Sequence, residues 1–307
     1  MRRKSGKRSS NHRKLFEFRR AVTVTGHRRY MTANFWRTLT RSMGRVIVFV
    51  LLLTAAAAAQ DVETIIQRSV QANESDWAAD PQYDHYETDQ EDGDPPQTYE
   101  VQMILGSPYK RLVAVNGQEL SPEQQQAQGR KMQQAIAQRR AETPEQRAQR
   151  IAKWEKDRKR DHLMMEQLTK AFDFKLLGQQ RLGAYQVYTL KATPRPGYKP
   201  PNMQAQVLTG MQGKLWIDTK TFQWVKVQAK VIRPVSIEGI LATVEPGTHF
   251  ELEKAPVGDG VWEPTHFSMK SQAKVFFLFN HRSQENDLYF GYRRSGQLSV
   301  ASKTGGR

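Results

Sequence analysis

Residues 212–233 read QGKLWIDTKTFQWVKVQAKVIR and contain the clearest two-strand pattern in the chain. Leu-Trp-Ile at 215–217 favours a strand, and Asp-Thr-Lys-Thr at 218–221 has the composition of a turn. From residue 222 onward apolar and polar side chains alternate, so one face of this arm is apolar and the other is polar. The pattern predicts an antiparallel β-hairpin with one buried face. The apolar positions of its second arm are Val225, Val227, Ala229 and Val231.

The same alternation recurs on both sides of this hairpin. It predicts a mainly β protein of the α+β class, built on an antiparallel sheet in which one face of most strands is buried. The other strands are expected at about residues 83–88, 99–105, 110–115, 185–189, 249–253, 261–270, 275–279 and 287–293.

Helical signals occur in two parts of the chain. Apolar residues recur at helical spacing over residues 61–73, so a short amphipathic helix is expected to cover the sheet. Residues 121–124 (Ser-Pro-Glu-Gln) and 143–146 (Thr-Pro-Glu-Gln) each combine an N-cap hydroxyl, a proline at the first helical position and the glutamine of a capping box. They predict two helices, which end near residues 141 and 171.

These two helices form one polar insertion, residues 121–171, with only a thin apolar stripe. A helix of this kind lies mostly in water and contacts the body of the protein near its ends. Two interpretations follow from this polarity. The insertion is either a mobile lid or partner-docking arm, or a solvated connection between strands.

The N-terminal region has the layout of a secretory signal peptide. Arg41 and Arg45 precede the unbroken apolar run 46–53, and five alanines then lead to Gln60. The stretch 46–59 is shorter than the roughly 20 residues that span a bilayer, so we expect cleavage near Ala59 rather than a permanent anchor. The expected organisation is a basic leader, residues 1–59, and one exported domain, residues 60–307, which is periplasmic or secreted.

The 45 residues before the apolar run are longer than a signal peptide needs. Translation from Met31 or Met43 instead of Met1 would leave an ordinary leader. The alternative is a cytoplasmic basic arm that contacts anionic lipid or nucleic acid.

Most of the formal charge of +16 lies in this leader. Residues 1–59 hold 14 Lys or Arg and a single acid, Glu17, which leaves 33 bases and 30 acids for residues 60–307. The exported domain is therefore not expected to bind nucleic acid. The chain has no cysteine, which excludes disulfides, thiolate metal sites, a Cys nucleophile and a lipidated N-terminal Cys.

The common catalytic motifs are missing from the sequence: there is no Walker loop, GxSxG, HExxH or GxGxxG. The acidic turn at 89–96 does not place oxygen ligands at EF-hand spacing. His249, Glu251 and Glu253 share one strand face and suggest a weak metal site, but such a row is usually the polar side of a sheet, and His266 has the same interpretation. We therefore expect a protein that is not an enzyme, with no cofactor and no metal.

Two motifs resemble those of a known family. Residues 213–218 (GKLWID) run into 222–231, and residues 260–264 (GVWEP) run into 265–279. This arrangement is similar to the LolA/LolB-like fold of periplasmic lipoprotein carriers and the wider outer membrane lipoprotein-sorting protein family. The resemblance implies a half-barrel covered by helices, whose concave apolar face takes acyl chains and which has no enzymatic activity.

The chain also departs from that family. The insertion 121–171 is not found in the short carriers, and a chain without cysteine cannot be a lipid-anchored acceptor. The motifs cover residues 207–293 well, and the earlier half agrees only in the number of strands.

Two functions are consistent with these features. The first is an exported protein that binds a lipid, lipoprotein acyl chains or another hydrophobic ligand on the concave face. The second is an envelope scaffold or sensor that contacts another envelope protein and whose core is filled. The residues expected to line the ligand face are Val225, Val227, Val231, Phe250, Leu252, Phe267, Met269, Phe277 and Phe279.

Overall fold

The hairpin predicted at residues 212–233 forms as β7 (Met211–Asp218) and β8 (Trp224–Val231), which pair antiparallel. The structure is a computed structural model and describes residues 62–237, 242–275 and 279–296. The Asp218 carboxylate closes the turn, because its Oδ1 accepts hydrogen bonds from the backbone N–H of Lys220 and Thr221 at 3.0 and 2.8 Å. This turn chemistry is the one that the Asp-Thr-Lys-Thr sequence predicts.

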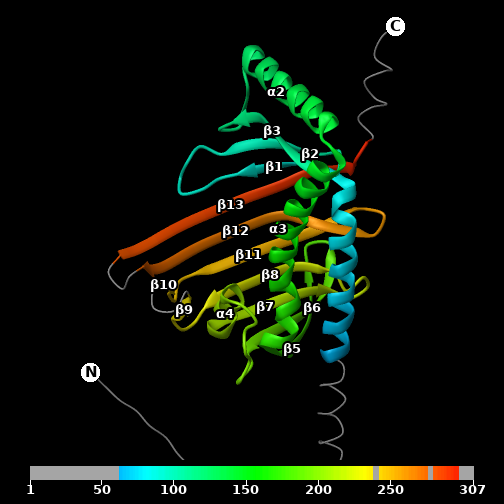
Figure 1. Ribbon diagram of the computed structural model, residues 1–307. Coiled ribbons are helices and arrows are strands. Elements are labelled where there is room, and N and C mark those ends of the chain that lie inside the picture. The colour runs from blue at the N-terminus through cyan, green and yellow to red at the C-terminus, as the bar shows by residue number, and fades with distance from the viewer. Residues whose placement is uncertain (1–61, 238–241, 276–278, 297–307) are drawn as a thin grey trace, which may run out of the picture. The chain divides into compact units, whose positions relative to one another are not determined.

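β7 and β8 belong to a 13-stranded sheet whose main path runs in the order β4-β3-β2-β1-β13-β12-β11-β8-β7-β6-β5 (Figure 1). All pairings between its described strands are antiparallel, and the sheet is curved and not closed. β9 and β10 lie off this path, where β10 pairs with both β9 and β12. The remaining strands are β1 (Tyr83–Asp89), β2 (Gln97–Ile104), β3 (Ser107–Val115), β4 (Gln118–Glu119), β5 (Phe172–Leu182), β6 (Tyr185–Pro194), β9 (Val235–Ile237), β10 (Ala242–Val244), β11 (His249–Gly258), β12 (Val261–Val275) and β13 (Phe279–Arg294).

The predicted α+β class with a curved antiparallel sheet is confirmed. The strand expected at residues 275–279 includes residues 276–278, which lie outside the described residues. Of the other two positions, Val275 ends β12 and Phe279 begins β13, and these two residues are paired.

Both predicted capping boxes form. Ser121 caps α2 (Pro122–Ala141) and Thr143 caps α3 (Pro144–Ala171), each with its glutamine hydrogen-bonded back to the cap. α3 passes directly into β5. The short helix expected at residues 61–73 extends further, over residues 62–79, and we call it the N-terminal helix. The short helical segments are η1 (Asp80–Gln82), α4 (Met203–Gln206) and η2 (Val207–Gly210).

The N-terminal helix and α3 lie side by side across one face of the sheet (Figure 1), which we call the helix-covered face. The main hydrophobic cluster lies between these helices and strands β5–β8. It combines Ile65 and Ile66 of the N-terminal helix with Leu190, Leu215 and Val227 of the sheet. Amphipathic spacing in the helix and alternation in the strands therefore place their apolar faces against each other. No helix in the described part of the chain has the length and apolar character needed to cross a membrane.

Candidate ligand site on the helix-covered face

The helix-covered face has two different halves. Over β7 and β8, which we call the filled half, the side chains are buried beneath the helices, whereas over β11 and β12 the apolar side chains are only half-buried. In the filled half, the predicted site residues Val227 and Val231 are only 5% and 3% exposed and pack in the main cluster. Ile65 and Ile66 of the N-terminal helix lie in the same cluster. At these two positions, the space expected for a ligand holds side chains of the protein itself.

The predicted residue Val225 does not share this environment. It packs with Val187 and Trp262 in a second, smaller cluster, while its neighbour Trp224 belongs to the main cluster. The reason is a register shift in the β7–β8 ladder, where Trp216 faces Lys226 but Ile217 faces Trp224. Such a bulge interrupts the two-residue alternation on which the prediction rested.

Four of the predicted residues form what we call the apolar strip, on β11 and β12. Leu252 is paired with Phe267 and Phe250 with Met269, and all four side chains are half-buried. Paired residues of antiparallel strands point to the same face, and Leu252 also faces Val227 across β8. The structure therefore brings these four predicted residues together on the helix-covered face. Phe277 lies outside the described residues, and Phe279 is the first residue of β13.

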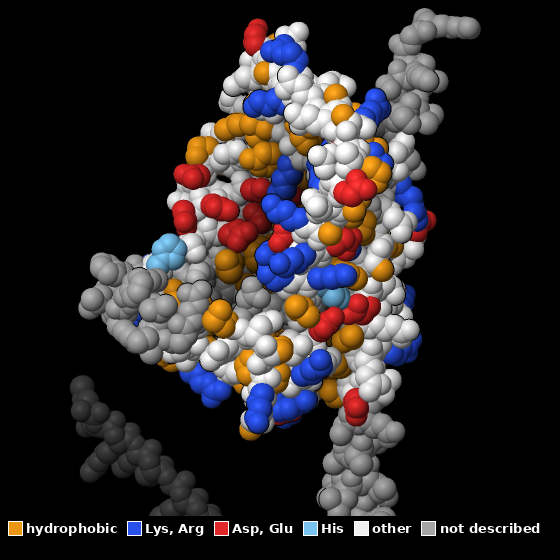
Figure 2. Space-filling view, viewed as in Figure 1, with side chains coloured by type: hydrophobic (Ala, Val, Ile, Leu, Met, Phe, Trp, Pro, Cys, Tyr) orange, Lys and Arg blue, Asp and Glu red, His pale blue; other side chains and the backbone are white. Residues whose placement is uncertain are grey.

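Beyond the apolar strip the same face becomes acidic. Asp287 on β13 is paired with Phe267, and Glu285 with Met269, so these acids follow directly on from the strip. Glu87 on the next strand, β1, is paired with Tyr289. Figure 2 shows Asp and Glu side chains gathered in a hollow over β1 and β13, next to Lys and Arg side chains.

The pKa values of these acids move in opposite directions. Burial, followed by the charge of Glu285, raises the pKa of Asp287 to about 7. Burial and the charge of Glu87 raise the pKa of Asp89. Burial opposes ionisation of Glu87 as well, but hydrogen bonds from His85 and Lys110 lower its pKa to about 2. The face therefore keeps a charged Glu87 carboxylate, which is paired with Lys110, beside Asp89 and Asp287, whose pKa values are raised toward neutral pH.

A cavity of about 340 Å³ lies between the two helices and this part of the sheet. Leu252 of the apolar strip lines it, so the cavity and the strip are continuous. Its other lining residues are Asn73, Asp76, Trp77, Asp80, His85, Arg158, His162, Lys254, Glu263, Pro264, Tyr289 and Tyr292.

Three buried polar atoms of this lining have no hydrogen-bond partner in the described part of the chain. They are Trp77 Nε1, His85 Nδ1 and Glu263 Oε1. Burial, with the charge of Asp80 next in size, raises the pKa of Glu263 to about 8. Buried polar groups are normally paired in proteins, so three unpaired ones around a single cavity mark it as a candidate site.

Polar contacts hold α3 over the cavity. Arg158 donates hydrogen bonds to the Asp80 carboxylate at 3.2 Å and to the carbonyl oxygen of Trp77. His162 stacks on the Trp77 ring, with 4.3 Å between ring centroids, and its Nε2 lies 2.9 Å from Glu74 Oε1. Arg158 also lies over the Trp77 ring, 4.3 Å from its centroid, so polar and ring contacts together hold α3 over the cavity.

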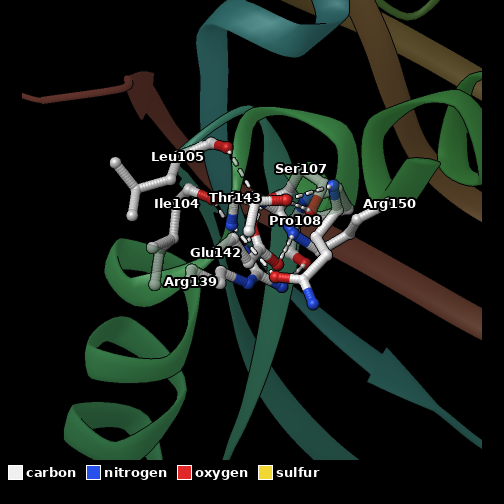
Figure 3. Close-up of polar contacts among 9 residues, drawn as sticks. Ile104, Leu105, Ser107, Pro108, Arg139, Glu142, Thr143 and Arg150 are labelled. Carbon is white, nitrogen blue, oxygen red and sulfur yellow. Dashed lines mark hydrogen bonds and ion pairs between the residues drawn. The ribbon is translucent and has the colours of Figure 1, made fainter. Parts of the chain in front are cut away.

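The middle of the insertion, where α2 ends and α3 begins, is attached to the turn between β2 and β3, as Figure 3 shows. Arg139 donates to the carbonyl oxygens of Ile104, Ser107 and Pro108 at 2.7, 2.8 and 3.0 Å. Arg150 donates to the Ser107 hydroxyl at 2.6 Å and pairs with Glu142. This attachment lies at the α2–α3 junction. Its donors are arginines, and the apolar pattern of the two helices does not predict their contacts.

Among the residues that the structure describes, two groups of three side chains bring possible metal-ligating atoms within 4.8 Å of one another. One is Glu74, His162 and Glu166, and the other is Glu251, Glu253 and His266. In the second group Lys226 already bonds both carboxylates. His249, which the sequence placed beside these acids, instead lies with Nδ1 3.1 Å from the Gly247 carbonyl oxygen.

No protein-family model matches the chain, and no curated protein sequence matches it. Several solved structures do. An outer membrane lipoprotein-sorting protein domain from Vibrio parahaemolyticus is 13% identical with a TM-score of 0.22, over 44% of this chain and 46% of that one. A LolA superfamily protein from Nitrosomonas europaea is 10% identical with a TM-score of 0.30, over 76% of this chain and 92% of that one. A DUF1329 family protein from Desulfovibrio piger is 10% identical with a TM-score of 0.26, over 80% and 97%.

This chain thus spans less than half of the Vibrio domain. The solved structures to which the chain is similar include a LolA superfamily protein and a lipoprotein-sorting domain, the family that residues 213–218 and 260–279 resemble. Both TM-scores are below 0.5, and the fold is described by the strand order of this chain itself.

Proposed function

We propose that this chain is an exported, non-enzymatic binding protein that takes a hydrophobic or amphiphilic ligand, such as a lipid or the acyl chains of a lipoprotein, on its helix-covered face. Residues 1–59 act as a leader in this proposal, and residues 60–307 are one periplasmic or secreted domain that carries the insertion 121–171.

One observation carries the proposal. The apolar strip is only half-buried, although it adjoins a cluster whose members are almost fully buried. Burial of a methylene group gains about 0.8 kcal/mol, so an acyl chain that covered Phe250, Leu252, Phe267 and Met269 would be held by several such increments. The cavity beside Leu252 gives the ligand a second, polar surface.

The cover over this surface supports the same function. Arg158 and His162 hold α3 near the cavity. If these contacts break, water can hydrate both polar side chains in place of their protein partners. Parting these contacts exposes little apolar surface of α3, since the helix has mostly charged and polar residues. A ligand could therefore enter beneath α3 without disruption of the main cluster.

Displacement of a fluorescent fatty-acyl probe, with native mass spectrometry of the purified protein, tests the proposal. Met269→Gln places a polar amide on the apolar strip and should weaken probe binding about tenfold or more. Leu288→Gln is the matched control, because Leu288 is 45% exposed and is paired with His266 on the opposite face. Equal probe binding by both variants and the unchanged protein would refute the apolar strip as the ligand surface.

The second candidate is an envelope scaffold or sensor that acts through protein contacts. The filled half of the helix-covered face favours it, as does α2, which has no buried residue along its 20 residues. In this case the insertion would bind an envelope protein and no lipid would occupy the strip. Failure of every acyl probe to bind, with α2 still required for the recovery of a partner, would favour this function.

A further inference from the structure

We propose that the cavity beside Leu252 selects amphiphiles with an uncharged head that carries both hydrogen-bond donors and acceptors, such as the hydroxyl groups of a monoacylglycerol. This inference rests on the proposed function, because the tail of the ligand would lie on the apolar strip. It adds the chemical class of the head and the residues that recognise it.

The three unpaired atoms define what the head must offer. Glu263 is only 5% exposed, and its Oε1 faces no partner in the residues that the structure describes. Trp77 Nε1 is an N–H group, so it can only donate and needs an acceptor on the ligand. A buried polar group that makes no hydrogen bond is costly, so a ligand that satisfies all three atoms gains over one that satisfies none.

The tautomer of His85 fixes the third requirement. Its Nε2 lies 3.5 Å from Glu87 Oε2, and the pKa of Glu87 is lowered, so Glu87 is an ionised carboxylate that orients the Nε2–H toward itself. In the neutral ring Nδ1 is then an acceptor and needs a donor on the ligand. The head must therefore offer a donor to His85 and an acceptor to Trp77.

Glu263 is suited to either kind of contact. Because burial and Asp80 raise its pKa to about 8, it holds a proton at neutral pH and its carboxyl group both donates and accepts. Hydroxyl groups have the same dual character. A head with two or more hydroxyls thus offers both the donors and the acceptors that these residues require.

A negatively charged head has no free cation to meet in this lining. The Lys254 ammonium is 2.9 Å from Asp76, and the Arg158 guanidinium is 3.2 Å from Asp80. The acidic residues of β1 and β13 lie on the same face. An anion placed there would lose its hydration and face carboxyl groups, so a fatty acid should bind more weakly than its glycerol ester.

Three probes with the same oleyl tail test this: monoolein, oleate and oleylamine, each at pH 7 against the fluorescent acyl probe. We expect monoolein to displace the probe at a concentration at least tenfold below that of oleate. Equal displacement by all three would overturn the inference but leave tail binding intact. Strongest displacement by oleylamine would overturn it in favour of a cationic head. No displacement by any of them would instead refute the proposed function.

A pair of variants tests the residues. Trp77→Phe keeps an aromatic ring against His162 but removes the N–H donor, so the preference for monoolein over oleate should fall several-fold. Trp216→Phe is the matched control, because Trp216 packs against the second cluster and does not line the cavity. Circular dichroism should show that both variants fold. An unchanged preference in folded Trp77→Phe would overturn the role of this residue and of the cavity.

Discussion

The ammonium group of Lys254 lies 2.9 Å from the carboxylate of Asp76, and both side chains are almost fully buried. The pair joins β11 to the N-terminal helix. The other carboxylate oxygen of Asp76 accepts hydrogen bonds from the Trp262 backbone N–H and from Gln223 Nε2, both at 3.0 Å. One acid thus fixes the helix to three separate strands or turns of the sheet region.

Asp76→Ala should therefore destabilise the protein strongly. It leaves the buried Lys254 ammonium without its charged partner and with only the Asn73 amide oxygen, 3.1 Å away, to accept a hydrogen bond. Loss of one member of a buried ion pair costs about 3–5 kcal/mol. Urea denaturation measures this as a fall in the free energy of unfolding. The control is Asp259→Asn, which removes the charge of a surface ion pair with Arg294, suits the left-handed backbone at this position and should cost far less. A similar small loss for Asp76→Ala would show that the helix does not depend on this acid.

Glu263 should make the stability depend on pH. Its carboxyl group keeps its proton up to about pH 8 in the folded protein but releases it near pH 4.5 when unfolded. The folded state therefore binds more protons between these values, and the free energy of unfolding falls as the pH rises through this window, by at most about 1.4 kcal/mol per unit. Burial is the largest cause of the raised pKa; the charges of Asp80 and Asp76 raise it further, and those of Lys254 and Arg158 oppose the rise.

Glu263→Gln removes this titration and keeps a hydrogen-bonding side chain of the same shape. Unfolding of both proteins by urea, from pH 4 to pH 9, should show the variant gaining stability relative to the unchanged protein as the pH rises. Parallel curves over the whole range would mean that Glu263 ionises normally in the folded state.

Val227→Asp should unfold the protein and not merely empty a ligand site. Val227 is 5% exposed and packs in the main cluster, where an unpaired carboxylate would be buried at a large cost. Thermal unfolding followed by circular dichroism is the measurement. A folded variant that has lost only lipid binding would show that this half of the face is open to ligand.

The helical insertion should be dispensable for folding. α2 has no buried residue, and both helices carry their own capping boxes. Replacement of residues 122–170 by a short Gly/Ser linker should keep a cooperative thermal transition, at a cost of about 1.5–3 kcal/mol for loss of the Leu168 contact with the main cluster. A molten product without near-UV dichroism would instead assign the insertion to the core.

The leader should be removed on export. The apolar run 46–53 is short, is preceded by basic residues and is followed by alanines. N-terminal sequencing of the protein from the envelope fraction should begin near Gln60. Detection of peptides from residues 46–53 in the mature protein would contradict cleavage.

Alternation and capping motifs predicted most of the strands and both helices of the insertion, because each depends on near neighbours in the chain. The same logic placed four of the predicted ligand residues, Phe250, Leu252, Phe267 and Met269, together on one face. It failed at Val225, since a β-bulge between β7 and β8 changes the face without any mark in the alternation.

The polar part of the site could not be predicted in this way. Lys254 and Glu263 look like ordinary solvated residues of their strands, but both are buried in the structure by segments far away in the sequence, such as the N-terminal helix that carries Asp76. The cavity is likewise made by residues from β1, β11, β12, β13, α3 and the N-terminal helix. Patterns of neighbouring residues in the sequence do not show which side chains remain unpaired when such distant segments pack together.

The direct passage from α3 into β5 restricts how the cavity can open. Ala171 and Phe172 are both buried at this junction, and no loop separates the helix from the edge strand. The C-terminal end of α3 is therefore fixed to the sheet. The opposite end of α3, at the α2–α3 junction, is held to the β2–β3 turn by hydrogen bonds from Arg139 and Arg150 and by the Ile151 side chain, which lies against Gly106. Any deflection of α3 must start at that junction and decrease toward β5, so the cavity under Arg158 would widen first on the side of β1 and β2.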